Sequence, residues 1–195
     1  MVLNFLKGWS PVNTLSLHQL SMKVVLLCLL VSGQRGQAIH LLDLRNMTWE
    51  RDRVVCRFGD PTKTSTPKKH QGQIVLKAFI DKRLCVVHYL KAYKSRTELV
   101  RAKENRFFIS VRKPHKAVSR DTIRRWTKGG LVLAGVDMDI FNPHSTRAAS
   151  ASKAAQSVGL KTILKTVGWR TADTFAKYYK KKIVTEGQFA EAVLT

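Results

Sequence analysis

The sequence predicts a mainly α-helical fold with a small antiparallel β-sheet, an α+β domain. Apolar residues recur at the three- and four-residue spacing of helices over most of the chain, and only a few short segments are rich in β-branched residues. A chain of 195 residues that is 44% hydrophobic can bury a core of its own. We expect a peripheral segment at residues 1–16, one folded domain at 17–183 and a C-terminal tail at 184–195.

Helical patterns occur in seven segments. Leu17–Val31 is the most apolar and stops before Gly33, which predicts a buried helix. Its uninterrupted apolar run is far shorter than the roughly 20 residues that a membrane-spanning helix needs. The Ser119 hydroxyl can accept from first-turn amides, so a helix is expected from about Arg120. The other helical segments are Gln37–Leu44, Asp81–Tyr93, Thr146–Val158, Leu160–Val167 and Thr171–Lys181.

Strands are expected in three short segments. Arg53–Phe58 and Gln73–Phe79 are β-branched and flank Asp60–Gly72, which is rich in Pro, Thr, Lys and Gly. This order predicts a β-hairpin with a long basic tip. Phe107–Val111 is expected to be a third strand.

The composition indicates an anionic partner. The chain has 35 Lys+Arg against 13 Asp+Glu, a formal net charge of +22. Such an excess favours DNA, RNA or an anionic membrane surface, and the high apolar content excludes a disordered chain. Its cysteines, Cys28, Cys56 and Cys85, lack the spacing of a zinc site and predict reduced thiols of the cytosol or nucleus. We expect no metal, cofactor or membrane span.

Candidate catalytic residues stand in a fixed order along the chain. Arg35 follows the first buried helix, Lys63 lies on the hairpin tip, and His144 and Arg147 stand three apart in the sequence HSTR. Gly168-Trp169 and the pair Tyr178-Tyr179 follow. Each residue alone has a structural explanation, such as helix capping for Arg35 or core packing for Trp169; the ordered set is what indicates function.

This order resembles the catalytic domain of tyrosine recombinases, the phage-integrase superfamily, over Leu17–Ile183. Four phrases also resemble recombinases of DIRS-type and Crypton-like eukaryotic mobile elements: SGQRGQAIHLLDL, VRKPHKAVSRDTI, PHSTRAASASKAA and GWRTADTFAKYYKK. The resemblance implies a site-specific recombinase or integrase that cuts and rejoins double-stranded DNA through a 3′-phosphotyrosine.

The resemblance also implies a role for each residue. Arg35 and Arg147 would bind the non-bridging phosphate oxygens, and His144 would act as general acid/base or phosphate donor. Lys63 would protonate the leaving 5′-oxygen, and Trp169 would donate from its indole or brace the site. Family members act as tetramers on DNA, with the C-terminal segment exchanged between protomers.

Two positions are ambiguous. Spacing from Trp169 in the general family indicates Tyr178 as the nucleophile, whereas the eukaryotic-element phrase indicates Tyr179, which we favour. Lys63 shares the hairpin with Lys68, Lys69 and Lys77, so the tip is alternatively a set of DNA-backbone contacts. Residues expected to bind DNA without reading its bases are Lys68, Lys69, Arg112, Lys113, Lys116, Arg120, Arg124 and Arg125.

The chain departs from the family pattern twice. Sixteen residues precede the first matching helix, so we expect no N-terminal DNA-clamping domain, and Ala38 stands where many relatives have Glu. These departures support an alternative, a truncated or host-adopted mobile-element remnant that binds DNA with impaired catalysis. A type IB topoisomerase and an unrelated RNA-associated protein are further alternatives. The expected compartment is the nucleus or cytoplasm.

Overall fold

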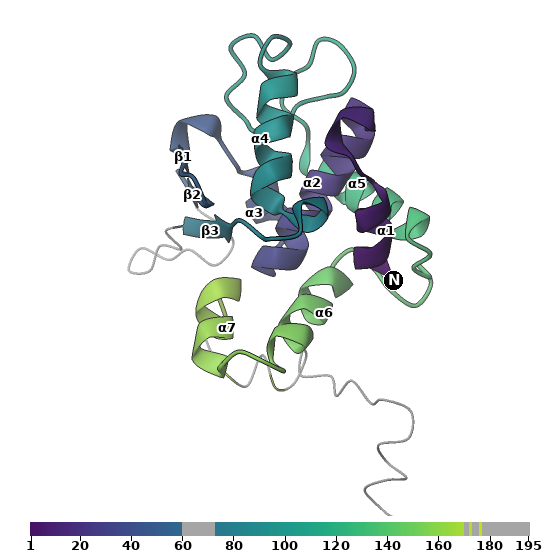
Figure 1. Cartoon of the computed structure of the whole chain (residues 1–195), viewed down its shortest axis with the longest axis vertical. Helices are drawn as coiled ribbons and strands as arrows, with labels where there is room; N and C mark the ends of the chain where they lie inside the picture. The colour runs from purple at the N-terminus through teal and green to yellow at the C-terminus, as the bar shows by residue number, and fades with distance from the viewer. Residues whose placement is uncertain (60–72, 170–171, 173–175, 177–195) are drawn as a thin grey trace, which may run out of the picture.

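A computed structural model describes residues 1–59, 73–169, 172 and 176, and it confirms the predicted fold class. Seven α-helices, three single-turn 3-10 helices and a three-stranded sheet make up this part of the chain (Figure 1). The helices are α1 (Val2–Gly8), α2 (Leu17–Ser32), α3 (Gly36–His40), α4 (Val86–Thr97), α5 (Arg120–Leu133), α6 (Ser145–Ala154) and α7 (Leu160–Val167). The strands are β1 (Met47–Trp49), β2 (Arg53–Arg57) and β3 (Gln73–Lys77).

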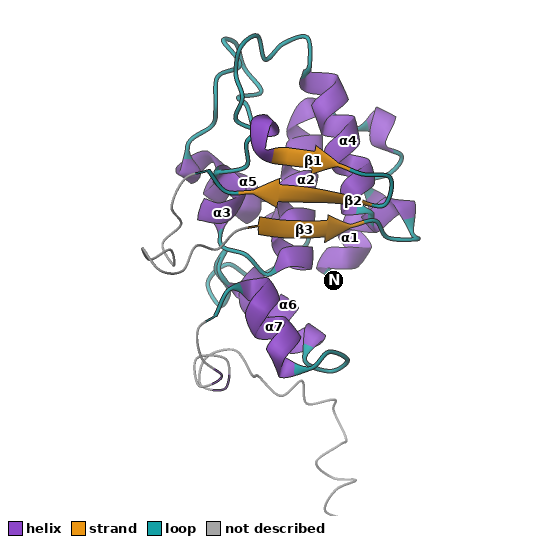
Figure 2. Cartoon of the chain, turned by 90° about the vertical axis from the view of Figure 1, so that its left-hand side faces the viewer, coloured by secondary structure: helices purple, strands orange, loops and turns teal. Residues whose placement is uncertain are grey.

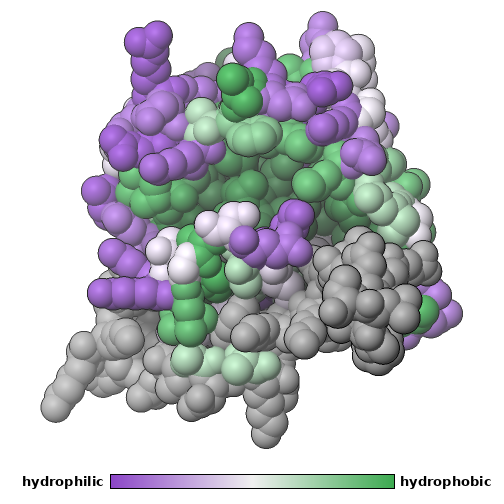
Figure 3. Space-filling view, turned by 60° about the horizontal axis from the view of Figure 1, so that its bottom comes forward, coloured by the Kyte–Doolittle hydropathy of each residue, from purple (hydrophilic) through white to green (hydrophobic). Residues whose placement is uncertain are grey.

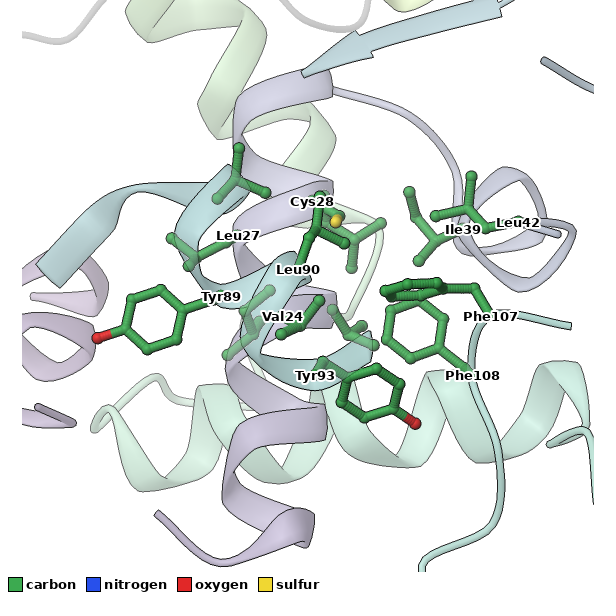
Figure 4. Packing of buried hydrophobic residues seen from close by; sticks show 14 of the residues in the cluster. Val24, Leu27, Cys28, Ile39, Leu42, Tyr89, Leu90, Tyr93, Phe107 and Phe108 are labelled. Carbon is green, nitrogen blue, oxygen red and sulfur yellow. The ribbon is translucent and has the colours of Figure 1, made fainter. Parts of the chain in front are cut away.

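Helix α2 is the centre of the fold. Ser16 and Gln19 form a capping box at its start, and Gly33 ends it in the left-handed conformation with φ 59°. Residues on all its faces are buried, because α4, α5, α6 and the sheet surround it. Val24, Leu27 and Cys28 of α2 pack against aromatic and aliphatic residues of α4, the α3 region and the loop before α5 (Figure 4).

The sheet lies over α2 and α4 in the order β1-β2-β3, with both pairs antiparallel (Figure 2). Pairs such as Cys56 with Ile74 and Val54 with Leu76 set the register and bury these four side chains. The β2–β3 pairing confirms the predicted hairpin, whose tip, Asp60–Gly72, lies outside the described residues.

The third predicted strand, Phe107–Val111, is wrong. This segment makes only isolated bridges, and its backbone bonds are divided between two neighbours: Phe107 N donates to Leu42 O, and Phe108 O accepts from Val118 N. Phe107, Phe108 and Ile109 are nevertheless fully buried in the core. The third strand is β1, a segment without a strong β pattern that pairs with the edge of β2.

Several helices differ in length from their predictions. The segment Gln37–Leu44 is helical only to His40, and α6 ends at Ala154 rather than Val158. Helix α4 continues to Thr97, past the expected end at Tyr93. The bounds Leu160–Val167 and the Ser119 cap on α5 are confirmed, since Ser119 Oγ accepts from Thr122 N. Most of the expected helix Thr171–Lys181 lies outside the described residues.

The N-terminal segment, expected to be peripheral, contributes to the core through α1. Leu6 is fully buried, and Leu15 is 5% exposed. A buried lysine of α2 holds this segment: Lys23 Nζ donates to Leu6 O (2.7 Å) and Trp9 O (2.6 Å) and lies 3.8 Å from the Tyr89 ring centroid. Two carbonyls and one ring face match the three N–H donors of an ammonium group.

Helices α6 and α7 form a smaller unit beside this core, below it in Figure 1. Their own apolar cluster consists of Ala151, Ile163, Val167 and Trp169. The side of the molecule on which they lie carries a band of apolar surface with hydrophilic borders (Figure 3). Part of the apolar surface between β3 and the end of α2 is a hollow lined by Leu3, Val31 and Phe79, each about half exposed. Among the described residues, no helix combines the length and apolarity that crossing a membrane requires.

We expect Lys23 to make stability depend on pH. Burial lowers its pKa from 10.5 to about 8, so the unfolded chain binds the extra proton between these values. The free energy of unfolding therefore rises with pH from about 8 to 10.5, by up to about 3 kcal/mol from this group. Urea unfolding at several pH values should show this rise in the wild type and lose it in Lys23→Met. Lys91→Met, which alters an exposed lysine of α4, is the control; a parallel pH dependence in all three proteins contradicts the prediction.

Candidate active site

The first candidate, Arg35, lies in the short connection between α2 and α3. The left-handed Gly33 turns the chain at the end of α2, and Arg35 then occupies the N-cap position of α3. Arg35 is half-buried, and its side chain makes no capping hydrogen bond to α3. The guanidinium is therefore available to the cavity that this connection borders.

His144 and Arg147 lie at the start of α6. Pro143 and the Thr146 hydroxyl, which donates to Pro143 O at 2.9 Å, shape this first turn. His144 is the exposed N-cap residue, and Arg147 is only 3% exposed. Arg147 Nη1 donates to Gly33 O at 2.8 Å, across 114 residues of sequence. This bond brings the α6 N-terminus to the connection that carries Arg35.

Arg35, His144 and Arg147 line one cavity of about 350 Å³. Its apolar wall includes Leu29 of α2 and Ile123 of α5, and two further cations, Arg120 and Arg124, reach it from the first turns of α5. Four guanidinium groups thus border the cavity, and Asp121 is the one carboxylate among its described lining residues. An arrangement of this kind favours a bound anion.

Arg120 of the cavity, together with Arg106, also acts on a nearby histidine, His40. His40, at the end of α3, donates from Nε2 to Val118 O at 3.1 Å. Burial lowers the pKa of His40, and the charges of Arg106 and Arg120 lower it further, against the effect of its carbonyl partner. The imidazole is therefore held towards its neutral form, chiefly by burial and in addition by these two cations.

Trp169 packs on the buried arginine. The Arg147 guanidinium carbon lies 4.9 Å from the Trp169 ring centroid, and Trp169 is 7% exposed. Gly168, left-handed at the end of α7 with φ 75°, turns the chain so that Trp169 reaches this position. The tryptophan contacts Arg147 rather than lining the cavity itself.

The predicted DNA-binding residues divide into three groups. Arg120 and Arg124 join the cavity, whereas Arg112 and Arg125 line a second, more open hollow of about 590 Å³ beside the N-terminal half of α5. Lys113 and Lys116 are exposed on the loop before α5 and line neither hollow. Outside the described residues lie the remaining candidates: Lys63, Lys68, Lys69, Tyr178 and Tyr179.

Sequence reasoning missed Gln34, which borders the cavity between Gly33 and Arg35. Its side chain is buried and donates from Nε2 to Thr166 O of α7 at 2.7 Å. The adjacency of Gln34 to Arg35 was the one signal available. In the part of the chain that the structure describes, no group of three His, Cys, Asp or Glu residues could hold a metal ion.

Comparisons with solved structures place this fold among recombinases. XerH site-specific recombinase bound to its difH substrate has a TM-score of 0.68 at 15% identity, over 100% of this chain and 50% of that chain. XerA recombinase has a TM-score of 0.69 at 14% identity, over 99% and 62%. A lambda integrase tetramer bound to a Holliday junction has a TM-score of 0.53 at 15% identity, over 88% and 47%. At these identities the likeness establishes the fold alone.

The chain thus spans about half to three fifths of the length of these recombinases. The search of curated proteins returned no match. The phage integrase family profile, in contrast, matches residues 8–183, most of the sequence. This match extends across α2, the sheet and the helices that border the cavity. The chain therefore belongs to the phage integrase family, the tyrosine recombinase family that its motifs indicate.

Proposed function

We propose that this chain cuts and rejoins double-stranded DNA through a 3′-phosphotyrosine intermediate, as the catalytic part of a site-specific recombinase or integrase. The observation that carries the proposal is the convergence of Arg35, His144 and Arg147 on one cavity in a member of the phage integrase family. Arg35 is far in sequence from His144 and Arg147, and it meets them only through the fold. An unrelated RNA-associated protein with scattered basic residues would not require such convergence.

In the proposed reaction the cavity holds the scissile phosphate. Arg35 and Arg147 bind its non-bridging oxygens, where negative charge increases in the pentacovalent transition state. Gly33 and Trp169 hold the Arg147 guanidinium in place, so little reorganisation is needed when the phosphate reacts. His144 serves as general acid/base or phosphate donor from its exposed position at the rim.

The motif supports the remaining roles. The Tyr179 hydroxyl, with Tyr178 as the alternative, attacks phosphorus and gives its proton to His144 acting as general base. The phosphotyrosine bond forms while the bond to the 5′-oxygen breaks. Lys63 donates the proton that the leaving 5′-oxygen takes up. Rejoining reverses these steps with a 5′-hydroxyl as the nucleophile. No cofactor is part of the proposal, because the energy of the broken phosphodiester is kept in the phosphotyrosine bond.

The flanking cations define the proposed path of the DNA backbone. Arg120 and Arg124 stand one helical turn apart on α5 and face the cavity, so their like charges repel until a phosphate lies between them. Arg112 and Arg125 border the neighbouring hollow. We propose that phosphates next to the scissile one follow this line, with the exposed Lys113 and Lys116 and the hairpin residues Lys68 and Lys69 gripping the duplex further along.

Oligomeric state, origin and compartment are proposed from the motif phrases and from the recombinases of similar fold. We propose a homo-oligomer, a tetramer on DNA, for which the lambda integrase tetramer on a Holliday junction is a precedent among proteins of similar fold. The four eukaryotic-element phrases support an origin in a DIRS-type or Crypton-like mobile element. Action on double-stranded DNA would take place in the nucleus or cytoplasm.

A second candidate function is DNA binding without turnover. Ala38 is buried in α3 where many relatives carry Glu, and none of the ion pairs between described residues involves Arg35. An arginine without carboxylate support is held less firmly against its phosphate. A covalent-adduct assay separates the two functions.

We expect the wild-type chain to form a covalent adduct with a nicked half-site suicide substrate built from repeats that flank the gene. Tyr179→Phe should form none, because the nucleophilic oxygen is removed, while Tyr178→Phe should retain it; denaturing gel electrophoresis measures both. Adduct that persists in Tyr179→Phe and vanishes in Tyr178→Phe would assign the nucleophile to Tyr178. Absence of adduct from the wild type would favour the non-catalytic function.

Arg35→Gln should lower the rate constant of adduct formation by about 10²- to 10³-fold at saturating DNA, the usual loss when one transition-state donor is removed. The dissociation constant for DNA should change far less, because most of the cationic surface remains. Arg35→Lys keeps the charge without the bidentate geometry and should be intermediate in rate. Equal rates for wild type and Arg35→Gln would remove Arg35 from the reaction.

Arg124→Gln should weaken DNA binding equally for all sequences and reduce the slope of log K against log salt by about 1, the value for one lost phosphate contact. Fluorescence anisotropy over a range of salt concentrations measures both quantities. Arg51→Gln removes an exposed arginine from the β1–β2 turn and is the matched control. Identical slopes for wild type, Arg124→Gln and Arg51→Gln would argue against a phosphate on this face of α5.

A further inference from the structure

Residues 33–35, which join α2 to α3, lie where three helices meet. Gly33 O accepts from Arg147 at the start of α6, and a Cβ atom added at Gly33 would lie 2.9 Å from Val167 Cγ2 at the end of α7. This close approach requires glycine. The short connection therefore contacts both α6 and α7 directly, and it carries Arg35.

The side chain of Gln34 is the polar link from this connection to α7. Gln34 is 4% exposed, and its Nε2 donates to Thr166 O at 2.7 Å across 132 residues of sequence. Thr166 lies in the last turn of α7, where helix carbonyls lack partners within the helix. Gln34 thus caps the C-terminal end of α7 from outside, three residues before Trp169.

The backbone of Gln34 is held as well. Gln34 N donates to Ser32 Oγ at 3.2 Å, and Ser32 Oγ in turn donates to Cys28 O inside α2. A chain of hydrogen bonds therefore runs from the central helix through Ser32 and Gln34 to the end of α7. Neither Gly33 nor Ser32 has a side chain long enough to reach Thr166, so the link depends on the glutamine.

We infer that Gln34 is a positioning residue that couples α7 to Arg35. Its hydrogen bond fixes the end of α7, Trp169 follows that end and packs on Arg147, and Arg147 binds the carbonyl one residue before Gln34. These contacts join the Gly33–Arg35 connection, α7 and α6 in a ring, so a shift of α7 moves the guanidinium groups of Arg35 and Arg147. The kinetic consequence rests on the proposed function; the mechanical coupling does not.

The test compares Gln34→Met with Gln156→Met. Methionine has a similar length and no donor, and Gln156 is an exposed glutamine of the connection between α6 and α7, outside the lining of the cavity. Hydrogen exchange of residues 160–169 is measured beside that of α4. The rate constant of adduct formation at saturating DNA and the dissociation constant are measured for each protein.

Gln34→Met should raise exchange in residues 160–169 by about tenfold without changing α4. It should lower the adduct rate constant by about 10- to 100-fold, the loss expected when reacting groups are misplaced by about 1 Å, with the dissociation constant within about threefold. Gln156→Met should match the wild type in all three measurements. Gln34→Glu adds a readout that simple packing would not change, because its carboxylate faces the Thr166 carbonyl and regains a donor only when protonated.

For Gln34→Glu, adduct rate and exchange protection, each relative to wild type at the same pH, should recover as the pH falls from 8 to 5.5. A ratio that stays flat would overturn the inference. So would exchange in Gln34→Met equal to that in Gln156→Met, or raised exchange with an unchanged rate. If the wild type forms no adduct, the proposed function fails, and the exchange measurements alone decide the coupling between Gln34 and α7.

Discussion

The buried guanidinium of Arg147 determines how α6 and α7 pack against the core around α2. Arg147 is 3% exposed, and a charge so far from water requires partners. It finds the Gly33 carbonyl at the left-handed end of α2 and the face of Trp169 just beyond α7. Because these two partners lie at the ends of α2 and α7 and Arg147 itself lies on α6, satisfying one side chain sets the positions of three helices together. Arg35 and His144 then reach the same cavity, since each stands within three residues of a group in this contact.

Helix α5 contributes both to the apolar core and to the charged surface of the cavity. Its inner face carries Ile123 and Trp126 into the core, while Arg120 and Arg124 border the cavity and Arg125 borders the neighbouring hollow. Concentrating like charges beside one another costs stability in the absence of an anion. The large apolar core around α2 and α4 offsets that cost, so the fold can hold a charged surface ready for phosphate (Figure 4).

The elements that were predicted well are those with a local physical signal. A continuous apolar run and a glycine define α2, the Ser119 hydroxyl starts α5, and Leu160–Val167 keeps its helical period up to Gly168. The segment Phe107–Val111 failed because its β propensity reflects burial, whereas its hydrogen-bond partners are split between two distant segments. Strand β1 is the opposite case. Its local β pattern is weak, and it forms a strand because it pairs with the edge of β2.

Apolar periodicity determined the fold class, and the order of motifs along the chain determined the candidates Arg35, His144 and Arg147. Both can be read from residue type and spacing without the tertiary structure. Only the tertiary structure decided that Arg120 and Arg124 share their cavity and that Gln34 joins α7 to the Arg35 connection. It also decided that Lys23, a cation that directly precedes the apolar run of α2, is a buried anchor for α1. Such contacts join residues from 14 to 132 positions apart, and no local period encodes which carbonyl a distant donor will meet.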